Sequence, residues 1–394
     1  MGARVTSVST FLLKAPVTAA FSASAVRGRH TSRTAILVRL DTDAGVSGWG
    51  ETFPALGSPP EAILDSVRGV LAPRLIGADP LPVRDLNAEM RRAARGMGTG
   101  VMRGISALDI AAWDLRGRLL GQPVCRLLGA SPNGKFPAVA TAVFYASPDA
   151  ASVEPRVEAA TRYRAMGFRG VKVKVGGLDP TRDLEHIAKI RAALPDDVML
   201  CADANSGYLL RTALVVARGL AALRTYWFEE PIVIDDVEGY KALAAATGMW
   251  TAGGQDLTSS QAFLPLLEAR ALHIVQPSVA AVGGISEATH AADQAARFGF
   301  KYCPTGWGTG LLVAASLHVR AATASAVSLP PPDLDWIEFG VSDNPLRDLV
   351  LREPLTLTDG MLGVHNGPGL GIEVDADRIR SVTETSFTVG AAAS

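Results

Sequence analysis

Two lysines and two carboxylates occur in the sequence in a combination that suits proton abstraction beside a metal ion. Lys172 and Lys174 alternate with valines in the run VKVKV. Asp203 ends the run VMLCAD, and Glu229 ends the run RTYWFE. Because side chains alternate along a strand, both lysines lie on one face of it. Burial and the repulsion between like charges both lower a lysine pKa, so we expect one of these amines to act as a base near neutral pH.

The two carboxylates follow the lysines at intervals close to one strand-and-helix unit each. In a barrel of parallel strands, the carboxyl ends of the strands meet at one mouth, where active sites lie. Carboxylate oxygens from neighbouring strands suit a hard cation such as Mg²⁺. Asp203 or Glu229 alone would equally well cap a helix, but the pair beside two lysines favours a metal site.

A repeating pattern positions these residues: a short β-branched or aromatic run is followed by an Ala-, Leu- and Arg-rich run with helical spacing. Eight repeats predict parallel strands with right-handed crossovers, the number that closes a (β/α)-barrel. An open doubly wound sheet is disfavoured, because KVGGLDP lacks the GxGxxG phosphate turn. The predicted strands are 136–145, 169–175, 198–203, 224–229, 249–254, 272–276, 300–304 and 335–339. The predicted helices are 151–166, 181–194, 209–222, 236–247, 258–269, 285–298 and 309–323.

The two ends of the chain have a different character. RTAILVRLDTDAGVSGWGE contains two short strands around an Asp-Ala-Gly turn, which predicts a hairpin, and amphipathic helices follow up to about residue 130. Residues after about 345 again consist of short strands and turns. We therefore expect an α+β domain of residues 1–130, a barrel of residues 131–345, and a C-terminal segment of residues 346–394 that returns to the first domain.

Composition excludes several classes of protein. The 394 residues include 38 Lys and Arg against 39 Asp and Glu, without the basic block typical of nucleic-acid binding. The sequence has no run of 18 apolar residues, so no membrane span is expected. The three cysteines form no CxxC pair, so neither a disulfide framework nor a zinc site is indicated, and a reducing cytoplasm is expected.

Several motifs together resemble the enolase superfamily, specifically its mandelate racemase/muconate lactonizing enzyme branch. In chain order they are GISALDIAAWDLRGRLLGQPVCRLLG, KVKV, DANSGY, WFEEP, VGGISEA and GPGLGIEV, and they match that family's order and spacing over nearly the whole chain. The resemblance implies a capping domain over a modified barrel, a homo-oligomer, and Mg²⁺-assisted removal of the proton α to a carboxylate through an enediolate. It also implies Lys174 as the base, Lys172 as its neighbour, and Asp203 and Glu229 as the first two metal ligands.

The sequence departs from the family pattern at three places. Gln255 stands where a third carboxylate ligand is usual, and Asp256 beside it is an alternative ligand. Ser278 and Thr305 replace the residues from which a second acid–base pair would come. A racemase that needs proton donors on both faces of its substrate is therefore disfavoured.

A lyase (dehydratase) or a cycloisomerase fits the remaining residues. The segments around PTGWGTG and the C-terminus resemble family members that act on sugar acids and sugar lactones, so we expect a small-molecule carboxylate of that class as substrate. Lys174 itself, Thr305, Tyr145 or Glu338 would assist the leaving group. The alternative is a degenerate member that binds a ligand or partner without turnover. The residues expected to bind substrate are Asn205, Asp256, Thr305, Glu338 and His30.

Overall fold

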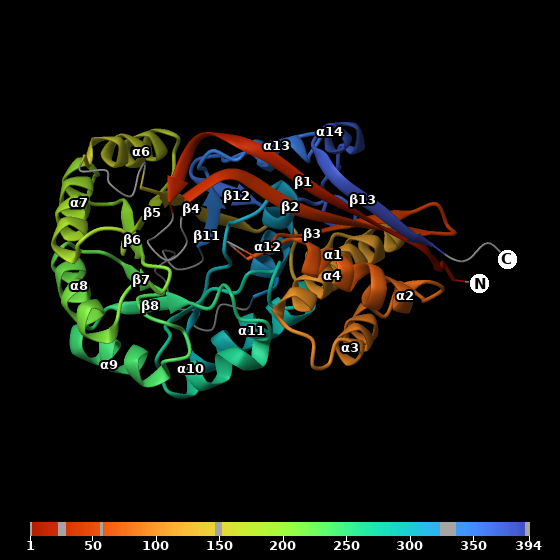
Figure 1. The fold of residues 1–394 in the computed structure, drawn as a ribbon, viewed down its shortest axis with the longest axis horizontal. Coiled ribbons are helices and arrows are strands. Elements are labelled where there is room, and N and C mark those ends of the chain that lie inside the picture. The colour runs from red at the N-terminus through yellow and green to blue at the C-terminus, as the bar shows by residue number, and fades with distance from the viewer. Residues whose placement is uncertain (1, 23–28, 56–57, 146–151, 324–335, 391–394) are drawn as a thin grey trace.

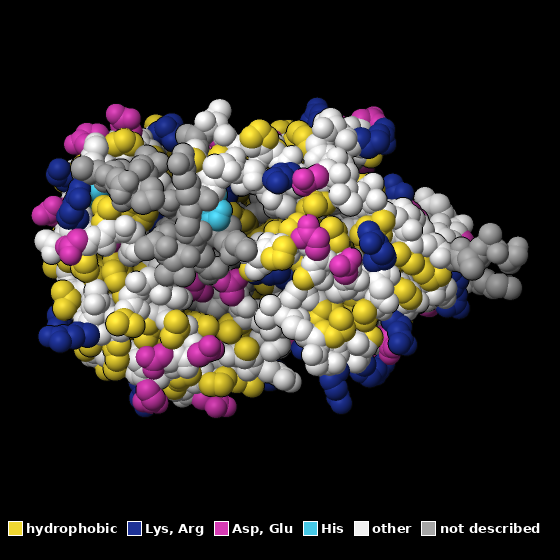
Figure 2. Space-filling view, in the orientation of Figure 1, with side chains coloured by type: hydrophobic (Ala, Val, Ile, Leu, Met, Phe, Trp, Pro, Cys, Tyr) yellow, Lys and Arg dark blue, Asp and Glu magenta, His cyan; other side chains and the backbone are white. Residues whose placement is uncertain are grey.

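The chain forms an elongated α+β part beside a barrel that is surrounded by helices (Figure 1). The computed structural model describes residues 2–22, 29–55, 58–145, 152–323 and 336–390. Among the described residues, no helix is long and apolar enough to cross a membrane. Basic and acidic side chains are interspersed on the face shown in Figure 2, in keeping with their nearly equal numbers.

A four-stranded antiparallel sheet, in the order β13-β1-β2-β3, forms the base of the α+β part. The predicted hairpin is present between β2 and β3, and its turn uses Gly45 at a φ of 70°. Strand β13 comes from the C-terminus and pairs with β1, so both ends of the chain build this part, as expected. The strands are β1 (Val5–Ser22), β2 (Arg29–Thr42), β3 (Ser47–Thr52) and β13 (Thr383–Gly390).

Helices pack on one face of this sheet. The longest, α4 (Thr99–Leu120), approaches β3 so closely that a Cβ at Gly50 would lie 1.9 Å from the carbonyl oxygen of Ala107. The other helices of this part are α1 (Glu61–Ser66), a π-helical turn (Val67–Leu71), α2 (Ala72–Leu75), α3 (Val83–Ala93) and α5 (Val124–Leu127).

The barrel contains eight parallel strands in the order β10-β9-β8-β7-β6-β5-β4-β11, and β12 pairs antiparallel with β4. Backbone hydrogen bonds from Glu338 to Pro304 (3.4 Å) and from Gly340 to Gly306 (3.2 Å) join β11 to the segment that follows β10 and close the barrel. The strands are β4 (Lys135–Val143), β5 (Gly170–Lys174), β6 (Met199–Asp203), β7 (Trp227–Glu229), β8 (Trp250–Gly253), β9 (Ile274–Val275), β10 (Lys301–Tyr302), β11 (Ile337–Gly340) and β12 (Met361–Gly363).

Helices alternate with the strands and cover the outside of the barrel (Figure 1), which confirms the predicted fold class. The predicted helix 258–269 is divided into a 3₁₀ turn (Ser260–Phe263) and α10 (Leu264–Glu268), because Pro265 in the first turn of α10 has no N–H to continue a helical ladder. The other helices are α6 (Glu154–Ala165), α7 (Pro180–Ala193), α8 (Leu210–Ala222), α9 (Val237–Thr247), α11 (Gly284–Phe298), α12 (Gly310–Ala322), α13 (Pro345–Leu349) and α14 (Ala376–Ser381).

Buried carboxylates of the α+β part hold the first turns of two barrel helices. Glu51 of β3 accepts hydrogen bonds from the backbone N–H groups of Thr309 (2.8 Å) and Leu312 (3.1 Å) at the start of α12. Asp109 of α4 accepts from the N–H (3.0 Å) and hydroxyl (2.6 Å) of Ser286 at the start of α11. Because helix N-termini attract negative charge, these contacts fix the α+β part over the barrel.

Candidate active site

The strand register brings three of the predicted residues together at the carboxyl ends of β5, β6 and β7. Lys174 pairs with Asp203, and Asp203 pairs with Glu229. Residues at equal height on neighbouring parallel strands point the same way, so these side chains converge at the barrel mouth.

Lys172 lies in the barrel interior among three carboxylates. Its Nζ donates to Glu229 Oε1 (2.7 Å) and to Glu338, and lies 3.4 Å from Asp203 Oδ2. Burial lowers the pKa of Lys172, but the three carboxylates outweigh it and raise this pKa well above the ordinary value. Glu229 makes the largest of the raising contributions, followed by Glu338 on the eighth strand and then Asp203.

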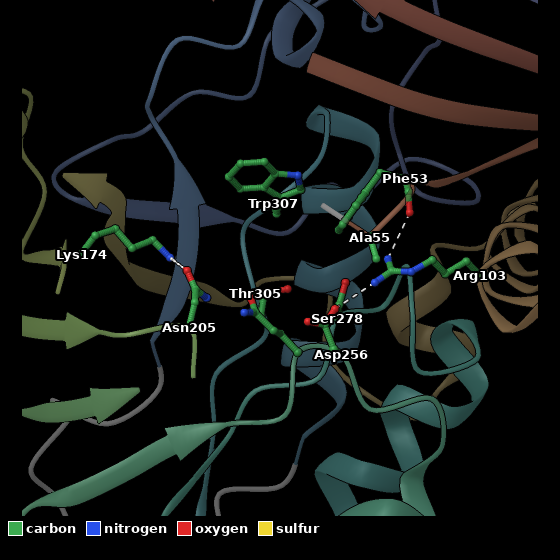
Figure 3. Close-up of a pocket in the computed structure, with 10 residues that line it drawn as sticks. Phe53, Ala55, Arg103, Lys174, Asn205, Asp256, Ser278, Thr305 and Trp307 are labelled. Carbon is green, nitrogen blue, oxygen red and sulfur yellow. Dashed lines mark hydrogen bonds and ion pairs between the residues drawn. The ribbon is translucent and has the colours of Figure 1, made fainter. Parts of the chain in front are cut away.

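Lys174 is the member of the lysine pair that reaches the cavity at the mouth. Its Nζ donates to Asn205 Oδ1 (2.7 Å), as Figure 3 shows. It also donates to Asp203 Oδ2 (2.5 Å) and lies 5.8 Å from the centre of the Phe144 ring. Although burial alone would raise the pKa of Asp203, the two lysines hold it well below its usual range. Asp203 is thus a carboxylate at neutral pH.

Glu229 and Glu338 are connected by a residue that the sequence interpretation missed. Gln276 donates from Nε2 to Glu229 Oε2 (3.0 Å) and Glu338 Oε1 (3.3 Å), while its own Oε1 is buried and has no hydrogen-bond partner among the residues that the structure describes. Burial and the charge of Asp203 raise the pKa of Glu229 well above its usual range. Gln276 ends the predicted strand 272–276, so its position at a strand end was the signal that could have identified it.

The donor set fits a hard divalent cation. Among the described residues, three buried carboxyl groups, those of Asp203, Glu229 and Glu338, form ion pairs with two ammonium groups, those of Lys172 and Lys174, so acidic groups outnumber basic groups in a site shielded from water. Within the described ranges, no three His, Cys, Asp or Glu side chains form a metal-binding group. A metal ion here would therefore need a further oxygen ligand beside two of these carboxylates, and Mg²⁺ accepts either an amide or a carboxylate oxygen.

The two candidates for a third ligand are held differently. Gln255 donates from Nε2 to Glu230 Oε2 (2.9 Å), so its amide oxygen is turned away from that carboxylate. Asp256 accepts from Arg103 (2.9 Å), which also donates to the carbonyl oxygen of Phe53 (3.1 Å). Arg103 belongs to α4, so the α+β part supplies one wall of the site (Figure 3).

A cavity lies over these groups, between the barrel mouth and the α+β part. Ser278 and Thr305 line it with buried hydroxyl oxygens that have no hydrogen-bond partner among the described residues. Trp307 and Phe53 form an aromatic wall opposite Lys174 (Figure 3). The complete lining is Phe53, Ala55, Arg103, Lys174, Asn205, Gln255, Asp256, Ser278, Thr305 and Trp307.

The structure separates the predicted site residues into groups. Those that line the cavity are Lys174, Asn205, Gln255, Asp256 and Thr305. Those in the buried cluster beneath it are Lys172, Asp203, Glu229 and Glu338. His30 lines an adjoining pocket that shares Phe53 and Trp307, and its ring lies 5.3 Å from that of Phe21. The tyrosine considered as an acid, Tyr145, instead donates to buried Asp183 (2.6 Å) and is not part of the cavity lining.

Two family models match most of the chain. Residues 7–129 match the mandelate racemase/muconate lactonizing enzyme N-terminal domain, and residues 156–378 match the enolase C-terminal domain-like model. The chain belongs to the mandelate racemase/muconate lactonizing enzyme family of the enolase superfamily. Its fold, a capping domain over a barrel, is that of the solved structures of this superfamily to which it is similar.

Individual relatives in this superfamily are enzymes of sugar-acid metabolism. The chain is 34% identical to D-galactarolactone cycloisomerase of Agrobacterium fabrum, covering 95% of this chain and 98% of that protein. It is 31% identical to arabinonate dehydratase of Saccharolobus solfataricus, covering 86% and 88% respectively. These relatives are dehydratases and cycloisomerases, so they give no support to the alternative of a member without turnover.

The chain is also similar to solved structures of a cycloisomerase and a dehydratase. The 3,6-anhydro-D-galactonate cycloisomerase from Zobellia galactanivorans has a TM-score of 0.84 and 29% identity, covering 97% of this chain and 100% of that chain. L-talarate/galactarate dehydratase from Salmonella typhimurium, in a structure with Mg and L-glucarate, has a TM-score of 0.87 and 26% identity, covering 99% and 94%.

Proposed function

We propose that the protein is a Mg²⁺-dependent dehydratase or cycloisomerase that removes the proton α to the carboxylate of a sugar acid or its lactone, with Lys174 as the base. The observation that carries this proposal is the position of Lys174. Its amine lines the cavity and lies within hydrogen-bonding distance of Asp203 and Asn205, at the mouth where Glu229 also ends its strand. A general base must lie within reach of the proton that it takes.

Asp203, Glu229 and the amide oxygen of Gln255 would hold the cation. Bound Mg²⁺ would supply positive charge beside the substrate carboxylate, where negative charge develops as the proton leaves. Lys172, kept protonated by its three carboxylate neighbours, adds a fixed positive charge next to the same group. Its role is therefore electrostatic, whereas Lys174 is the one that exchanges a proton.

The cavity wall suits a polyhydroxylated substrate. The hydroxyls of Ser278 and Thr305 have no hydrogen-bond partner in the described part of the chain and would bind substrate hydroxyl groups. Trp307 offers a ring face against which the C–H face of a sugar ring can pack. Tyr145 does not serve as an acid, because burial and Asp183 raise its pKa well above the ordinary value and its O–H is used by Asp183. Lys174, Thr305 and Glu338 remain the candidates for assisting the leaving group.

We also propose that the protein is cytoplasmic and that it forms a homo-oligomer. Its cysteines, Cys125, Cys201 and Cys303, are free and buried, which suits a reducing compartment.

The test is α-proton exchange in D₂O. The protein with Mg²⁺ is incubated with a panel of aldonic acids, aldaric acids and their lactones, and ¹H NMR follows the α proton. We expect its exchange or loss with at least one substrate, and none with Lys174→Met or after chelation. Lys241→Met, which changes an exposed lysine, is the matched control and should retain activity. Absence of exchange across the panel, together with absence of Mg²⁺ binding, would overturn the proposal.

A further inference from the structure

A buried hydrogen-bond network lies behind Lys174, outside the cavity lining, and connects the loops that follow β4, β5 and β6. At its centre is Asp183, in the first turn of α7 and fully buried. We infer that Asp183 is a positioning residue: it fixes the backbone after β5 and thereby holds the amine of Lys174 against Asp203 and Asn205. This inference rests on the proposed role of Lys174 as the base.

Three donors from three loops converge on the Asp183 carboxylate. Tyr145, after β4, donates its hydroxyl to Oδ1 (2.6 Å). Gly176, two residues after Lys174, donates its N–H to Oδ2 (2.8 Å), and Tyr208, after β6, donates its hydroxyl to the same oxygen (2.9 Å). A carboxylate can accept from all three, whereas an amide would turn its NH₂ group toward at least one of these donors.

Two further contacts complete the restraint on the same short loop. Gly177 donates its N–H to the Tyr145 hydroxyl (3.1 Å), and it approaches the ring so closely that a Cβ there would lie 2.4 Å from a ring carbon. On the other side of the loop, Arg156 of α6 donates to the carbonyl oxygen of Lys174. The backbone is therefore held both at Lys174 itself and at the two glycines that follow Val175.

Arg156 is in turn held by its surroundings. It is buried, its guanidinium lies 4.4 Å from the centre of the Tyr145 ring, and it contacts His186 Nδ1 (3.0 Å). Burial and the charge of Arg156 lower the pKa of His186, so the imidazole is neutral and accepts this hydrogen bond. The anion Asp183 and the cation Arg156 thus act on one loop from two helices, α7 and α6.

The network also positions the aromatic side of the site. Phe144 directly precedes Tyr145, and its ring lies 5.8 Å from Lys174 Nζ and 4.6 Å from the Phe21 ring of the capping domain. Fixing the Tyr145 hydroxyl therefore restrains both the base and the ring beside it. A displacement of about 1 Å at such a site costs on the order of 100-fold in rate.

The experiment compares Asp183→Asn with Asp109→Asn. Asp109 is the matched control because it is also fully buried and also accepts from three donors, two on Ser286 and one on Asn87, but at the interface with α11. We expect Asp183→Asn to lower kcat by about 10- to 100-fold with KM changed by less than about threefold. Asp109→Asn should reduce the unfolding midpoint comparably and leave kcat within about twofold. Tyr208→Phe, which removes one of the three donors, should give an intermediate kcat.

A second measurement needs no substrate and separates this inference from the proposed function. Hydrogen–deuterium exchange is followed on the peptide that spans residues 172–178. We expect faster exchange in Asp183→Asn, where the amide oxygen cannot accept from all three donors and the restraint on the loop is weaker, and wild-type exchange in Asp109→Asn. Wild-type exchange of this peptide in Asp183→Asn, or equal loss of kcat in both variants, would overturn the inference whether or not the proposed substrate class is correct.

Discussion

Gln255 donates its amide N–H to Glu230 Oε2 at 2.9 Å, and this contact determines which way the amide faces. An ionised carboxylate only accepts hydrogen bonds, so the nitrogen of Gln255 must face Glu230 and the oxygen must face away from it. Glu230 is itself buried and held at a φ of 39°, a conformation that non-glycine residues seldom adopt. The proposed third ligand, which is neutral, is thus oriented by the carboxyl group of Glu230 beside it.

Glu230→Gln should weaken Mg²⁺ binding by about 10-fold or more, because groups that orient a ligand typically contribute this much to metal affinity. The variant removes one nearby negative charge and frees the amide of Gln255 to rotate. Isothermal titration calorimetry with Mg²⁺ measures the effect without any substrate.

Asp256→Asn is the variant that decides between the two candidate ligands. Because Asp256 is held by Arg103 of the capping domain, we expect its Mg²⁺ affinity to stay within about threefold of wild type, while Gln255→Ala binds at least about 10-fold more weakly. The reverse order of affinities would make Asp256 the ligand and would refute the orientation argument.

Much of the barrel site follows from local sequence pattern. Lys174, Asp203 and Glu229 each end a strand, and parallel pairing at equal register makes neighbours of strand ends. Their convergence is thus a consequence of strand boundaries alone, which hydrophobic runs mark clearly.

Contacts that depend on closure of the barrel, or on the capping domain, could not be predicted in this way. Glu338 reaches Lys172 across 166 positions of sequence because β11 closes the barrel beside β4, and its charge adds to that of Glu229 in raising the pKa of Lys172. Arg103 reaches Asp256 only because α4 lies over the mouth. Neither contact leaves a periodic signal in the sequence.

Removing the unpartnered hydroxyls should affect substrate binding and not stability. Ser278→Ala and Thr305→Val delete buried oxygens that form no hydrogen bond within the described protein, so no internal bond is lost. We expect unfolding midpoints at or slightly above that of wild type. A hydrogen bond to substrate is worth about 1 kcal/mol, so KM should rise about fivefold for each variant. Thermal unfolding measures the midpoints, and steady-state kinetics measure KM. A large loss of stability would show that the hydroxyls have protein partners.

Lys172→Met should destabilise the metal-free protein. The change leaves Asp203, Glu229 and Glu338 buried together without the ammonium that contacts all three, and breaking such a buried pairing costs about 3–5 kcal/mol. Added Mg²⁺ should recover part of this loss, because it replaces the missing positive charge. Urea denaturation at pH 7 with and without Mg²⁺ measures both effects. Unfolding curves equal to wild type in the absence of metal would contradict the assigned cluster.

Glu51 should make stability depend on pH. Burial raises its pKa from 4.5 to about 7, despite hydrogen bonds from Thr309 and Leu312 that act in the opposite direction. Between about pH 4.5 and 7 the folded protein holds a proton on Glu51 that the unfolded chain has released. The contribution of Glu51 to the free energy of unfolding therefore falls as the pH rises through this window, by about 3 kcal/mol in total, and is constant above about pH 7.

Glu51→Gln isolates this contribution, because glutamine does not titrate. Denaturant unfolding of both proteins at a series of pH values gives the difference in free energy of unfolding between wild type and variant. The free energy of unfolding of the wild type should fall relative to that of the variant between about pH 5 and 7, and the difference should then stay constant. A difference that stays constant across the window would mean that Glu51 is already ionised at pH 5 and that its helix-capping hydrogen bonds outweigh burial.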